Sequence, residues 1–389
     1  MVVKQIKNMQ IKITVMKKLT LALVLFTLTA CSKRDSSPTK PPSPPPPAPV
    51  VLPDTVLYIG ANNGVYAINA NTGSLVWKSN SNLDFAGSPF VDNNIVYISS
   101  MYSQFFAFNN NGTDKWQSPN RGFVYRSSPI VYKNTVYMQN LSDLSALNIS
   151  DGSIKWRLSE MGGMSSPTIL DNILYIGISK GGNNKVCAID LTNNSKKWEF
   201  NTGDTIWSSP AIANNVLYTG CDNDTVYAIN IIDGSLKWKF PTKKFIISSP
   251  TVSNNILYIG SADSNLYAIN TADGSLKWKL PIQREITSSP FVYNDVVYVG
   301  GRDKKLYAVN ISDGSMKWKF STEGLIDGSP IVYNGMAYIG SYDGKVYAIN
   351  AETGLKKWEF KAGSSIIGSP CIVLKNGTTI YSSLSGNQQ

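Results

Sequence analysis

The sequence contains no histidine among its 389 residues. Histidine is the usual general base beside a serine or cysteine nucleophile, and it is a common ligand of zinc and haem iron. Its absence excludes Ser-His-Asp and Cys-His catalysis, together with histidine-ligated zinc and haem sites. We therefore expect no catalytic residue, no metal ligand and no cofactor-binding residue in this chain.

Cysteine is scarce, and its four copies are far apart: Cys31, Cys187, Cys221 and Cys371. None belongs to a C-x-x-C motif or to a vicinal pair, so the spacing indicates neither a redox centre nor a metal site. The last three lie in or at the end of expected strands. We expect them to be small packing residues and not a disulfide framework.

Long basic runs are also missing, although the net charge is +10. Residues 1–30 carry five lysines and no acidic residue, and the remainder has 31 basic against 26 acidic residues. The remaining basic residues are spread along the chain, without a basic run or a basic helix. This pattern predicts no binding to nucleic acid.

The N-terminal residues have the pattern of an export signal. Lys17 and Lys18 precede an apolar run, Leu19 to Ala30, that is followed by Cys31. A helix of this length would rise only about 18 Å, which is too short for a hydrocarbon core of about 30 Å. We interpret residues 1–30 as a signal peptide, with Met16 as an alternative translation start.

Leu28-Thr29-Ala30-Cys31 resembles the lipobox of bacterial lipoproteins. The resemblance implies that Cys31 is lipidated and anchors the protein to a membrane of the bacterial envelope, with the outer membrane favoured and the periplasmic or surface side left open. An ordinary signal peptide with an incidental cysteine is the alternative. Residues 31–53 are rich in proline and serine, which favours an extended tether; a proline-rich ligand for another module is the other interpretation.

Residues 54–389 are dominated by an internal repeat of about 40 residues. Eight tryptophans mark it: Trp77, Trp116, Trp156, Trp198, Trp238, Trp278, Trp318 and Trp358. Eight Ser-Pro pairs keep register with them and end at Pro89, Pro129, Pro167, Pro210, Pro250, Pro290, Pro330 and Pro370. A repeat this regular is the first feature that decides a fold.

One repeat, Ser249 to Leu280, shows four short strands separated by turn residues such as Asn254-Asn255 and Asp273-Gly274. Four strands per unit of about 40 residues are typical of a propeller blade. No segment of this region has sustained helical periodicity. The sequence therefore predicts an all-β, eight-bladed β-propeller of four-stranded antiparallel blades, which we expect to be monomeric.

A glycine stands four residues before each tryptophan of the repeat, except that Asn194 precedes Trp198. Asparagine is, after glycine, the residue that tolerates positive φ best, so this exchange predicts a left-handed backbone at the position. The tryptophans are interpreted as packing groups between blades, because each buries a large apolar area. The alanine nine or ten residues earlier would let neighbouring sheets approach closely.

The repeat units do not begin and end together, which predicts that the two ends of the chain share one blade. The first tryptophan hairpin, Val65 to Lys78, has no Ser-Pro strand before it, and the last Ser-Pro strand, Ser369 to Leu374, has no hairpin after it. Pairing them would remove two exposed edges. Val56–Ile59 and Thr379–Ser382 both remain candidates for the second strand of this blade.

The pattern Leu266-Tyr267-Ala268-Ile269-Asn270, Asp273-Gly274 and Trp278 resembles the tryptophan-docking motif of pyrroloquinoline-quinone (PQQ) type propellers. That family includes the quinoprotein dehydrogenases. A resemblance to these enzymes would imply a quinone in the central channel, a calcium ion, an aspartate base and a vicinal disulfide. The chain has no vicinal cysteines and no long insertions between blades.

The layout of signal peptide, lipidated cysteine, tether and single propeller is similar to that of lipoproteins that support β-barrel assembly in the outer membrane. This similarity implies a non-catalytic scaffold that binds other envelope proteins. A quinoprotein dehydrogenase-like enzyme, or a surface adhesin or glycan-binding module, is the alternative. Fold arguments alone do not choose between them, because one fold hosts many functions.

The candidate partner-binding face lies where the chain leads into each Ser-Pro strand. Turns at the other end of the propeller repeat Asn-Asn and Asp-Gly pairs, whereas the residues three and four positions before each proline differ. Aromatic and arginine side chains are enriched among binding hot spots. The candidate residues are Phe85, Tyr125, Arg126, Met164, Trp207, Thr287 and Asp327. The alternative interpretation is that the side chains at these positions only fill the channel mouth, and the isoleucines that recur among them favour it.

Overall fold

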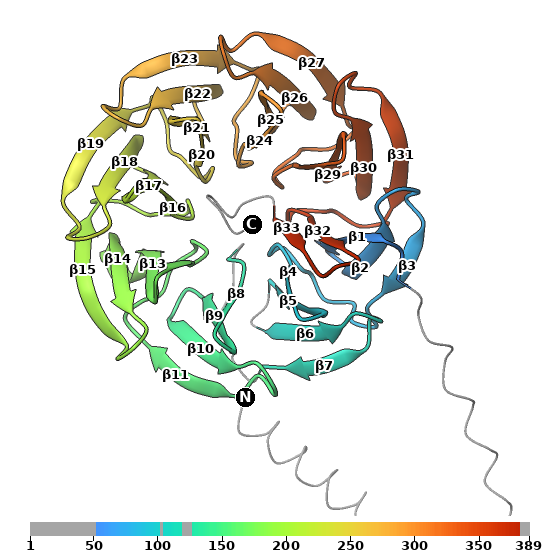
Figure 1. Ribbon diagram of the computed structural model, residues 1–389, viewed down its shortest axis with the longest axis horizontal. Helices are drawn as coiled ribbons and strands as arrows, with labels where there is room; N and C mark the ends of the chain where they lie inside the picture. Colours follow the sequence, from blue (N-terminus) through green and yellow to red (C-terminus); the bar gives the residue numbers. More distant parts are fainter. Residues whose placement is uncertain (1–51, 102–103, 119–126, 382–389) are drawn as a thin grey trace, which may run out of the picture. The chain divides into compact units, whose positions relative to one another are not determined.

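A computed structural model of the chain describes residues 52–101, 104–118 and 127–381. These residues form eight antiparallel blades around a central channel (Figure 1), so the prediction of an eight-bladed all-β propeller is confirmed. Cys31, Tyr125 and Arg126 lie outside the described residues. In the described part of the chain, no helix is long and apolar enough to span a membrane.

Seven blades are continuous in sequence, and their strands run in chain order from the channel to the rim. Blade 2 contains β4 (Phe90–Asp92), β5 (Ile95–Ser99), β6 (Phe105–Asn109) and β7 (Asp114–Gln117). Blade 3 contains β8 (Ile130–Tyr132), β9 (Thr135–Gln139), β10 (Leu144–Asn148) and β11 (Ile154–Leu158). Blade 4 contains β12 (Thr168–Leu170), β13 (Ile173–Ile178), the 3-10 helix η1 (Lys180–Gly182), β14 (Lys185–Asp190) and β15 (Ser195–Asn201).

The next four blades are the most regular. Blade 5 contains β16 (Ala211–Ala213), β17 (Val216–Cys221), β18 (Thr225–Asn230) and β19 (Leu236–Pro241). Blade 6 contains β20 (Thr251–Ser253), β21 (Ile256–Gly260), β22 (Asn265–Asn270) and β23 (Leu276–Pro281). Blade 7 contains β24 (Phe291–Tyr293), β25 (Val296–Gly301), β26 (Lys305–Asn310) and β27 (Met316–Ser321). Blade 8 contains β28 (Ile331–Tyr333), β29 (Met336–Gly340), β30 (Lys345–Asn350) and β31 (Lys356–Lys361).

Blade 1 is built from both ends of the described chain, which confirms the predicted closure. Its strands are β1 (Thr55–Ala61), β2 (Gly64–Asn69), β3 (Leu75–Lys78), β32 (Cys371–Leu374) and β33 (Thr379–Tyr381), in the sheet order β3-β2-β1-β32-β33. The second position goes to β1, which pairs with β2 from Val56↔Asn69 to Ala61↔Gly64 and with β32 from Thr55↔Leu374 to Tyr58↔Cys371.

The other candidate, around Thr379, forms β33 instead, on the inner edge of β32. All seven residues of β1 are buried, whereas β33 has three half-buried residues, so β1 gains far more from the interior position. Tyr381 stacks on Phe90 of blade 2, with ring centroids 4.7 Å apart, and its hydroxyl donates to the carbonyl of Val91 at 2.7 Å. Strand β33 thus ties the closing blade to its neighbour.

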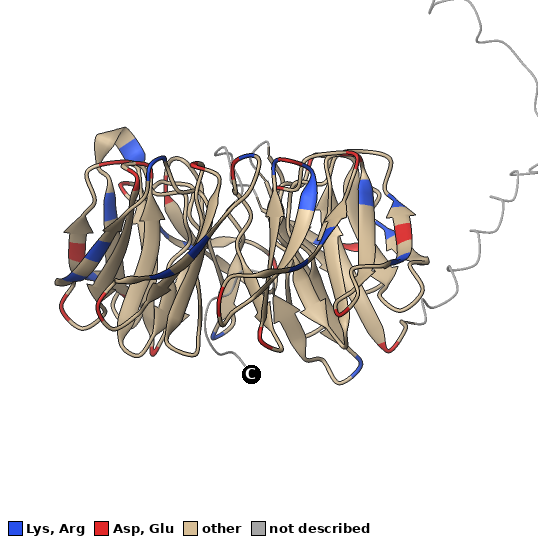
Figure 2. Ribbon diagram, turned by 90° about the horizontal axis from the view of Figure 1, so that it is seen from above, with Lys and Arg blue, Asp and Glu red and all other residues tan. Residues whose placement is uncertain are grey.

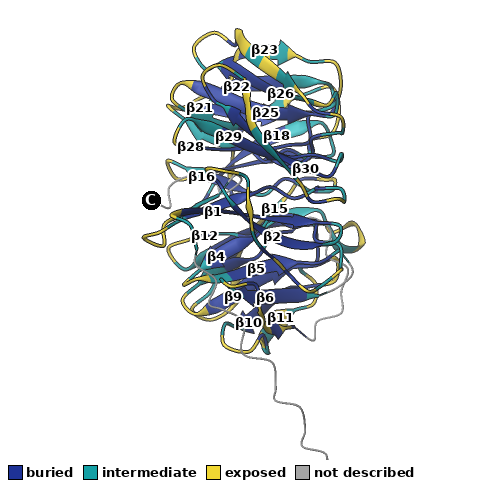
Figure 3. Cartoon of the chain, turned by 90° about the vertical axis from the view of Figure 1, so that its right-hand side faces the viewer, coloured by how far each residue is buried: buried dark blue, intermediate teal, exposed yellow. Residues whose placement is uncertain are grey.

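The core lies within and between the blades (Figure 3). The second and third strands are almost fully buried, and large tyrosines such as Tyr258 and Tyr298 are among the least exposed side chains. Cys187, Cys221 and Cys371 are buried free thiols, as expected for packing residues. The turns form the exposed surface of both faces.

The tryptophan side chain of each outer strand bridges to the following blade. The indole N–H of Trp238 donates to the carbonyl of Thr271 at 2.9 Å, and a Cβ on Gly274 would lie 2.8 Å from this indole. The same hydrogen bond joins Trp77 to Asn110, Trp116 to Ile149, Trp198 to Ile231, Trp278 to Ile311, Trp318 to Ala351 and Trp358 to Ala70. Packing between blades is therefore directional as well as apolar.

Blade 4 is the exception to this pattern, because its turn carries Asn194 in place of glycine. Asn194 has φ 58°, which confirms the predicted left-handed backbone. In the described part of the chain, the indole N–H of Trp156, in the preceding blade, donates no hydrogen bond to it. An asparagine thus satisfies the backbone angle that this turn requires.

Candidate binding face at the channel mouth

A closed ring of serines forms the floor of the candidate site. The backbone N–H of each serine that precedes a repeat proline donates to the side-chain oxygen of the next such serine, with N···O distances of 2.8–3.1 Å. The ring runs through Ser88, Ser128, Ser166, Ser209, Ser249, Ser289, Ser329, Ser369 and back to Ser88. Eight hydrogen bonds between blades thus fix the inner wall of the channel.

The residues three positions before the repeat prolines line, together with the serine ring, a cavity of about 80 Å³. Its walls include Ala86, Met164, Trp207, Ile247, Thr287, Asp327 and Ile367. These are the described members of the ring of positions that the sequence singled out, so the structure brings Met164, Trp207, Thr287 and Asp327 together. Whether they bind a partner is a separate question, taken up below.

Asp327 is the centre of a polar network on one side of the mouth. Its carboxylate accepts hydrogen bonds from Arg302 Nε at 3.0 Å, from the Tyr342 hydroxyl at 2.9 Å and from the Thr287 hydroxyl at 2.8 Å. The Asp327 side chain is fully buried, whereas the Arg302 side chain is about one third exposed. Hydrogen bonding to Asp327 raises the pKa of Arg302, so this guanidinium stays charged. The network joins blades 7 and 8.

Trp207 lines the mouth where the chain leads into blade 5. It is half-buried, and its indole N–H donates to Asp222 Oδ2 at 2.9 Å. Burial raises the pKa of Asp222, and its Oδ1 is buried without a hydrogen-bond partner in the described part of the chain. The hydrogen bond fixes the orientation of the ring, so that a large aromatic surface is presented at little further entropic cost.

Three of the expected contact residues lie deeper than the sequence interpretation assumed. Phe85 has no exposed surface and packs edge-on against Phe106, 5.4 Å between centroids. The corresponding Ile246 of another blade is equally buried, so this position belongs to the core. Thr287 and Asp327 are only 6% and 5% exposed, because they bond to one another and to Arg302. Among the described candidates, Met164 and Trp207 remain partly accessible.

The opposite face is built from turns that repeat the same chemistry. Asn254 and Asn255 both have positive φ, 50° and 59°, which suits a tight hairpin turn. In the Asp-Gly turns, Asp273 accepts hydrogen bonds from the backbone N–H and the hydroxyl of Ser275, and these bonds lower its pKa. Such local bonds stabilise the turns themselves.

The sequence interpretation missed Arg302, Tyr342 and Asp222, which hold the mouth residues in place. The sequence did contain a signal for them. All three residues begin a turn between the second and third strands of a blade, and the residue type at this position varies from blade to blade; blade 6, for example, has Ala262 there. The serine ring was visible as eight Ser-Pro pairs, but its hydrogen bonds depend on the distance between blades.

A family model described as outer membrane protein assembly factor BamB matches residues 32–206, 182–288 and 278–387. The chain belongs to this family. No curated protein matches it in a sequence comparison. BamB-like membership places the chain among cell-envelope proteins and PQQ-type propellers.

Solved structures share the fold at low sequence identity. BamB from Moraxella catarrhalis is 16% identical, with a TM-score of 0.61 over 76% of this chain and 93% of that chain. A europium-containing methanol dehydrogenase is 14% identical, with a TM-score of 0.64 over 76% and 82%. The computationally designed protein Ika8 is 15% identical, with a TM-score of 0.65 over 75% and 94%. Enzymes and non-enzymes thus share this architecture, and the likeness shows the fold alone.

The residues of the channel do not fit the quinone that the dehydrogenase relatives imply. The described cysteines are three separate buried thiols, so no vicinal disulfide can form among them. No group of three or more His, Cys, Asp or Glu residues that could hold a metal ion occurs in the described ranges. The carboxylate of Asp327 is already bonded to Arg302.

Proposed function

We propose that this protein is a non-catalytic propeller scaffold that binds other proteins of the cell envelope through its channel mouth. The most concrete form of this role is support of β-barrel assembly in the outer membrane, which the BamB family membership favours. The proposed partner is another envelope protein, and nucleic acid plays no part.

One observation carries the proposal: the mouth presents an anchored aromatic ring beside rigid polar groups. Trp207 is half-buried and held by Asp222, while Asp327, Arg302 and Tyr342 form a fixed network across the channel. Tryptophan and arginine dominate binding hot spots, and a preorganised side chain loses little entropy on binding. Trp207 and Asp327 line the cavity of about 80 Å³, and a side chain from a projecting loop of the partner protein would enter it.

The same arrangement argues against the enzyme alternative. The carboxylate of Asp327 is not free to act as a base, because it accepts hydrogen bonds from three neighbours. We expect titration with PQQ and calcium to give no saturable change in absorbance and no alcohol- or sugar-dependent dye reduction. Submicromolar quinone binding would overturn this part of the proposal.

Lipid anchoring at Cys31 is the second element of the proposal. The lipobox-like sequence supports it, and an anchor would confine the propeller to the membrane on which its partners assemble. Cys31→Ala should abolish palmitate labelling and release the protein from the membrane fraction. Sedimentation of this variant with membranes in high salt would mean that something other than lipidation holds it there.

Crosslinking in intact envelopes followed by purification of this protein tests the partner class. We expect components of the β-barrel assembly machinery to be enriched relative to a strain that expresses an unrelated lipoprotein at the same level. Enrichment of glycan-uptake proteins instead would favour the adhesin or glycan-binding alternative. The absence of any reproducible partner would contradict the scaffold role.

A further inference from the structure

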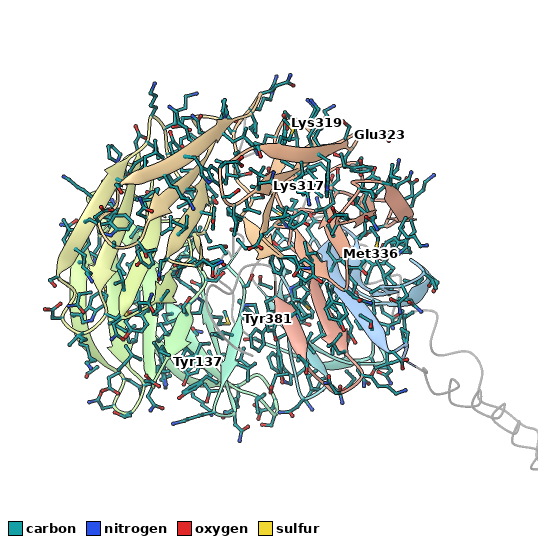
Figure 4. The ribbon with its side chains drawn as sticks, turned by 45° about the horizontal axis from the view of Figure 1, so that its top comes forward. Tyr137, Lys317, Lys319, Glu323, Met336 and Tyr381 are labelled. Atoms are coloured by element: carbon teal, nitrogen blue, oxygen red, sulfur yellow. The ribbon has the colours of Figure 1, made fainter. Side chains whose placement is uncertain are left out.

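The outer strands of blades 5, 6 and 7 carry a basic arc that the mouth-binding function does not use. We define it as β19, β23 and β27, with the sequences LKWKFP, LKWKLP and MKWKFS. Each strand exposes two lysines that flank an inward-facing tryptophan, and none contains an acidic residue. The lysines are Lys237, Lys239, Lys277, Lys279, Lys317 and Lys319. The three strands follow one another along the rim (Figure 1), and Lys317 and Lys319 are labelled in Figure 4.

The outer strands on either side of the arc each carry an acidic residue, which the arc lacks. In β15 and β31, the residue after the tryptophan is Glu199 or Glu359 instead of lysine. Glu199 pairs with Lys185 at 2.8 Å and with Lys196 at 2.5 Å, and Glu359 pairs with Lys356 at 2.7 Å. The fold therefore accepts glutamate at this position, and the lysines of the arc are not required for blade formation.

The charges of the arc are largely uncompensated in the described part of the chain. Lys317 lies 3.3 Å from Glu352, whereas the other five lysines form no ion pair there. The aspartates of the Asp-Gly turns, Asp233, Asp273 and Asp313, each bond to a serine of their own turn, and no ion pair joins them to these lysines in the described part of the chain. Figure 2 shows basic residues on the outer strands when the ring is seen edge-on.

Each strand of the arc also begins with an exposed apolar side chain. Leu236 and Leu276 are both 45% exposed, and Met316 is 44% exposed. Lysines interleaved with partly exposed aliphatic side chains are the composition of surfaces that lie on anionic lipid, where apolar groups enter the interface and ammonium groups meet phosphates.

We propose that the basic arc is a peripheral membrane-binding surface that docks the rim of the propeller on an anionic lipid bilayer. Six lysines supply the attraction, and the exposed side chains of Leu236, Leu276 and Met316 supply apolar contact. The inference rests on neither the lipid anchor nor the mouth. Edge-on docking would leave both faces of the ring, including the mouth, open to a partner protein.

The test uses residues 32–389, which lack the expected signal peptide and the predicted lipidation site, and vesicles of phosphatidylcholine with or without phosphatidylglycerol. We expect co-sedimentation only with phosphatidylglycerol, and it should weaken steeply as salt rises. The triple variant Lys239→Glu/Lys279→Glu/Lys319→Glu copies the residue that β15 and β31 carry. Its affinity should fall at least about 100-fold, since each lysine near an anionic surface contributes about a factor of five.

The matched control changes three exposed lysines outside the arc: Lys78→Glu/Lys115→Glu/Lys357→Glu. Net charge changes equally in both variants, so the control should keep most of the vesicle binding. Equal loss in both variants would show that overall charge, and not this surface, attracts the lipid. Unchanged binding of the arc variant would also overturn the proposal. The lysines would then serve only to keep the outer edge strands from pairing with other chains.

Discussion

The two faces of this propeller are built on different principles. On the turn face, each blade repeats local bonds, such as those from Ser275 to Asp273, and each paired-asparagine turn has the same positive φ angles. On the mouth face, equivalent positions hold Met164, Trp207, Thr287 and Asp327, and their hydrogen bonds reach other turns and other blades. Chemistry that every blade keeps serves the fold, whereas chemistry that varies is free to serve recognition.

Removing the closing blade should have the largest effect, because both faces depend on a closed ring. Deletion of residues 365–389 removes β32 and β33 and leaves β1 and its neighbours with an unpaired edge. Exposed strand edges promote association between chains. We expect an aggregated or unfolded product in size-exclusion chromatography and thermal melting. A truncated monomer that melts like the full-length protein would contradict the closure described above.

Two glycines, one on each face, allow the cost of close packing to be measured separately from the cost of backbone strain. Gly274, on the turn face, has φ 75° and faces the Trp238 indole at 2.8 Å, whereas Gly203, on the mouth face, has φ 85° and open space around it. Gly274→Ala should lower the free energy of unfolding by about 2–4 kcal/mol, and Gly203→Ala by about 1–2 kcal/mol. Urea denaturation measures both. Equal losses would show that close packing against the tryptophan does not distinguish the turn face.

Breaking the Asp327 network should lower the free energy of unfolding somewhat less than Gly274→Ala does. Asp327→Ile introduces the residue that blades 1 and 6 carry as Ile367 and Ile247, but it leaves Arg302 without its carboxylate. We expect a loss of about 2–3 kcal/mol in the free energy of unfolding. Adding Arg302→Ala, which copies Ala262 of blade 6, should restore part of it. Strictly additive effects in this double-mutant cycle would mean that the pair is not coupled.

The sequence predicted the ring because its signals are local and recur. Trp77 through Trp358 fix the blade period, and Asn194 identifies a left-handed turn from one exchange. The candidate site was harder to predict from the sequence, because the burial of side chains at the mouth depends on contacts between blades. Phe85 shares its position with buried isoleucines, and this recurrence was the signal that it belongs to the core. The inner position of β33 could not be foreseen, because three strand-forming residues do not specify which edge they join.

The most direct test compares one residue from each face in capture of the partner. Trp207→Ile copies Ile247 of blade 6, and Asn255→Gly copies Gly335 of blade 8, so both variants use residues that the chain already tolerates at those positions. We expect Trp207→Ile to reduce crosslinked recovery of barrel-assembly components by at least tenfold, as loss of a hot-spot aromatic does. Asn255→Gly should leave recovery unchanged, and both variants should melt within a few degrees of the parent protein. Loss of the partner in Asn255→Gly, with full recovery in Trp207→Ile, would contradict the assignment of the mouth as the binding face.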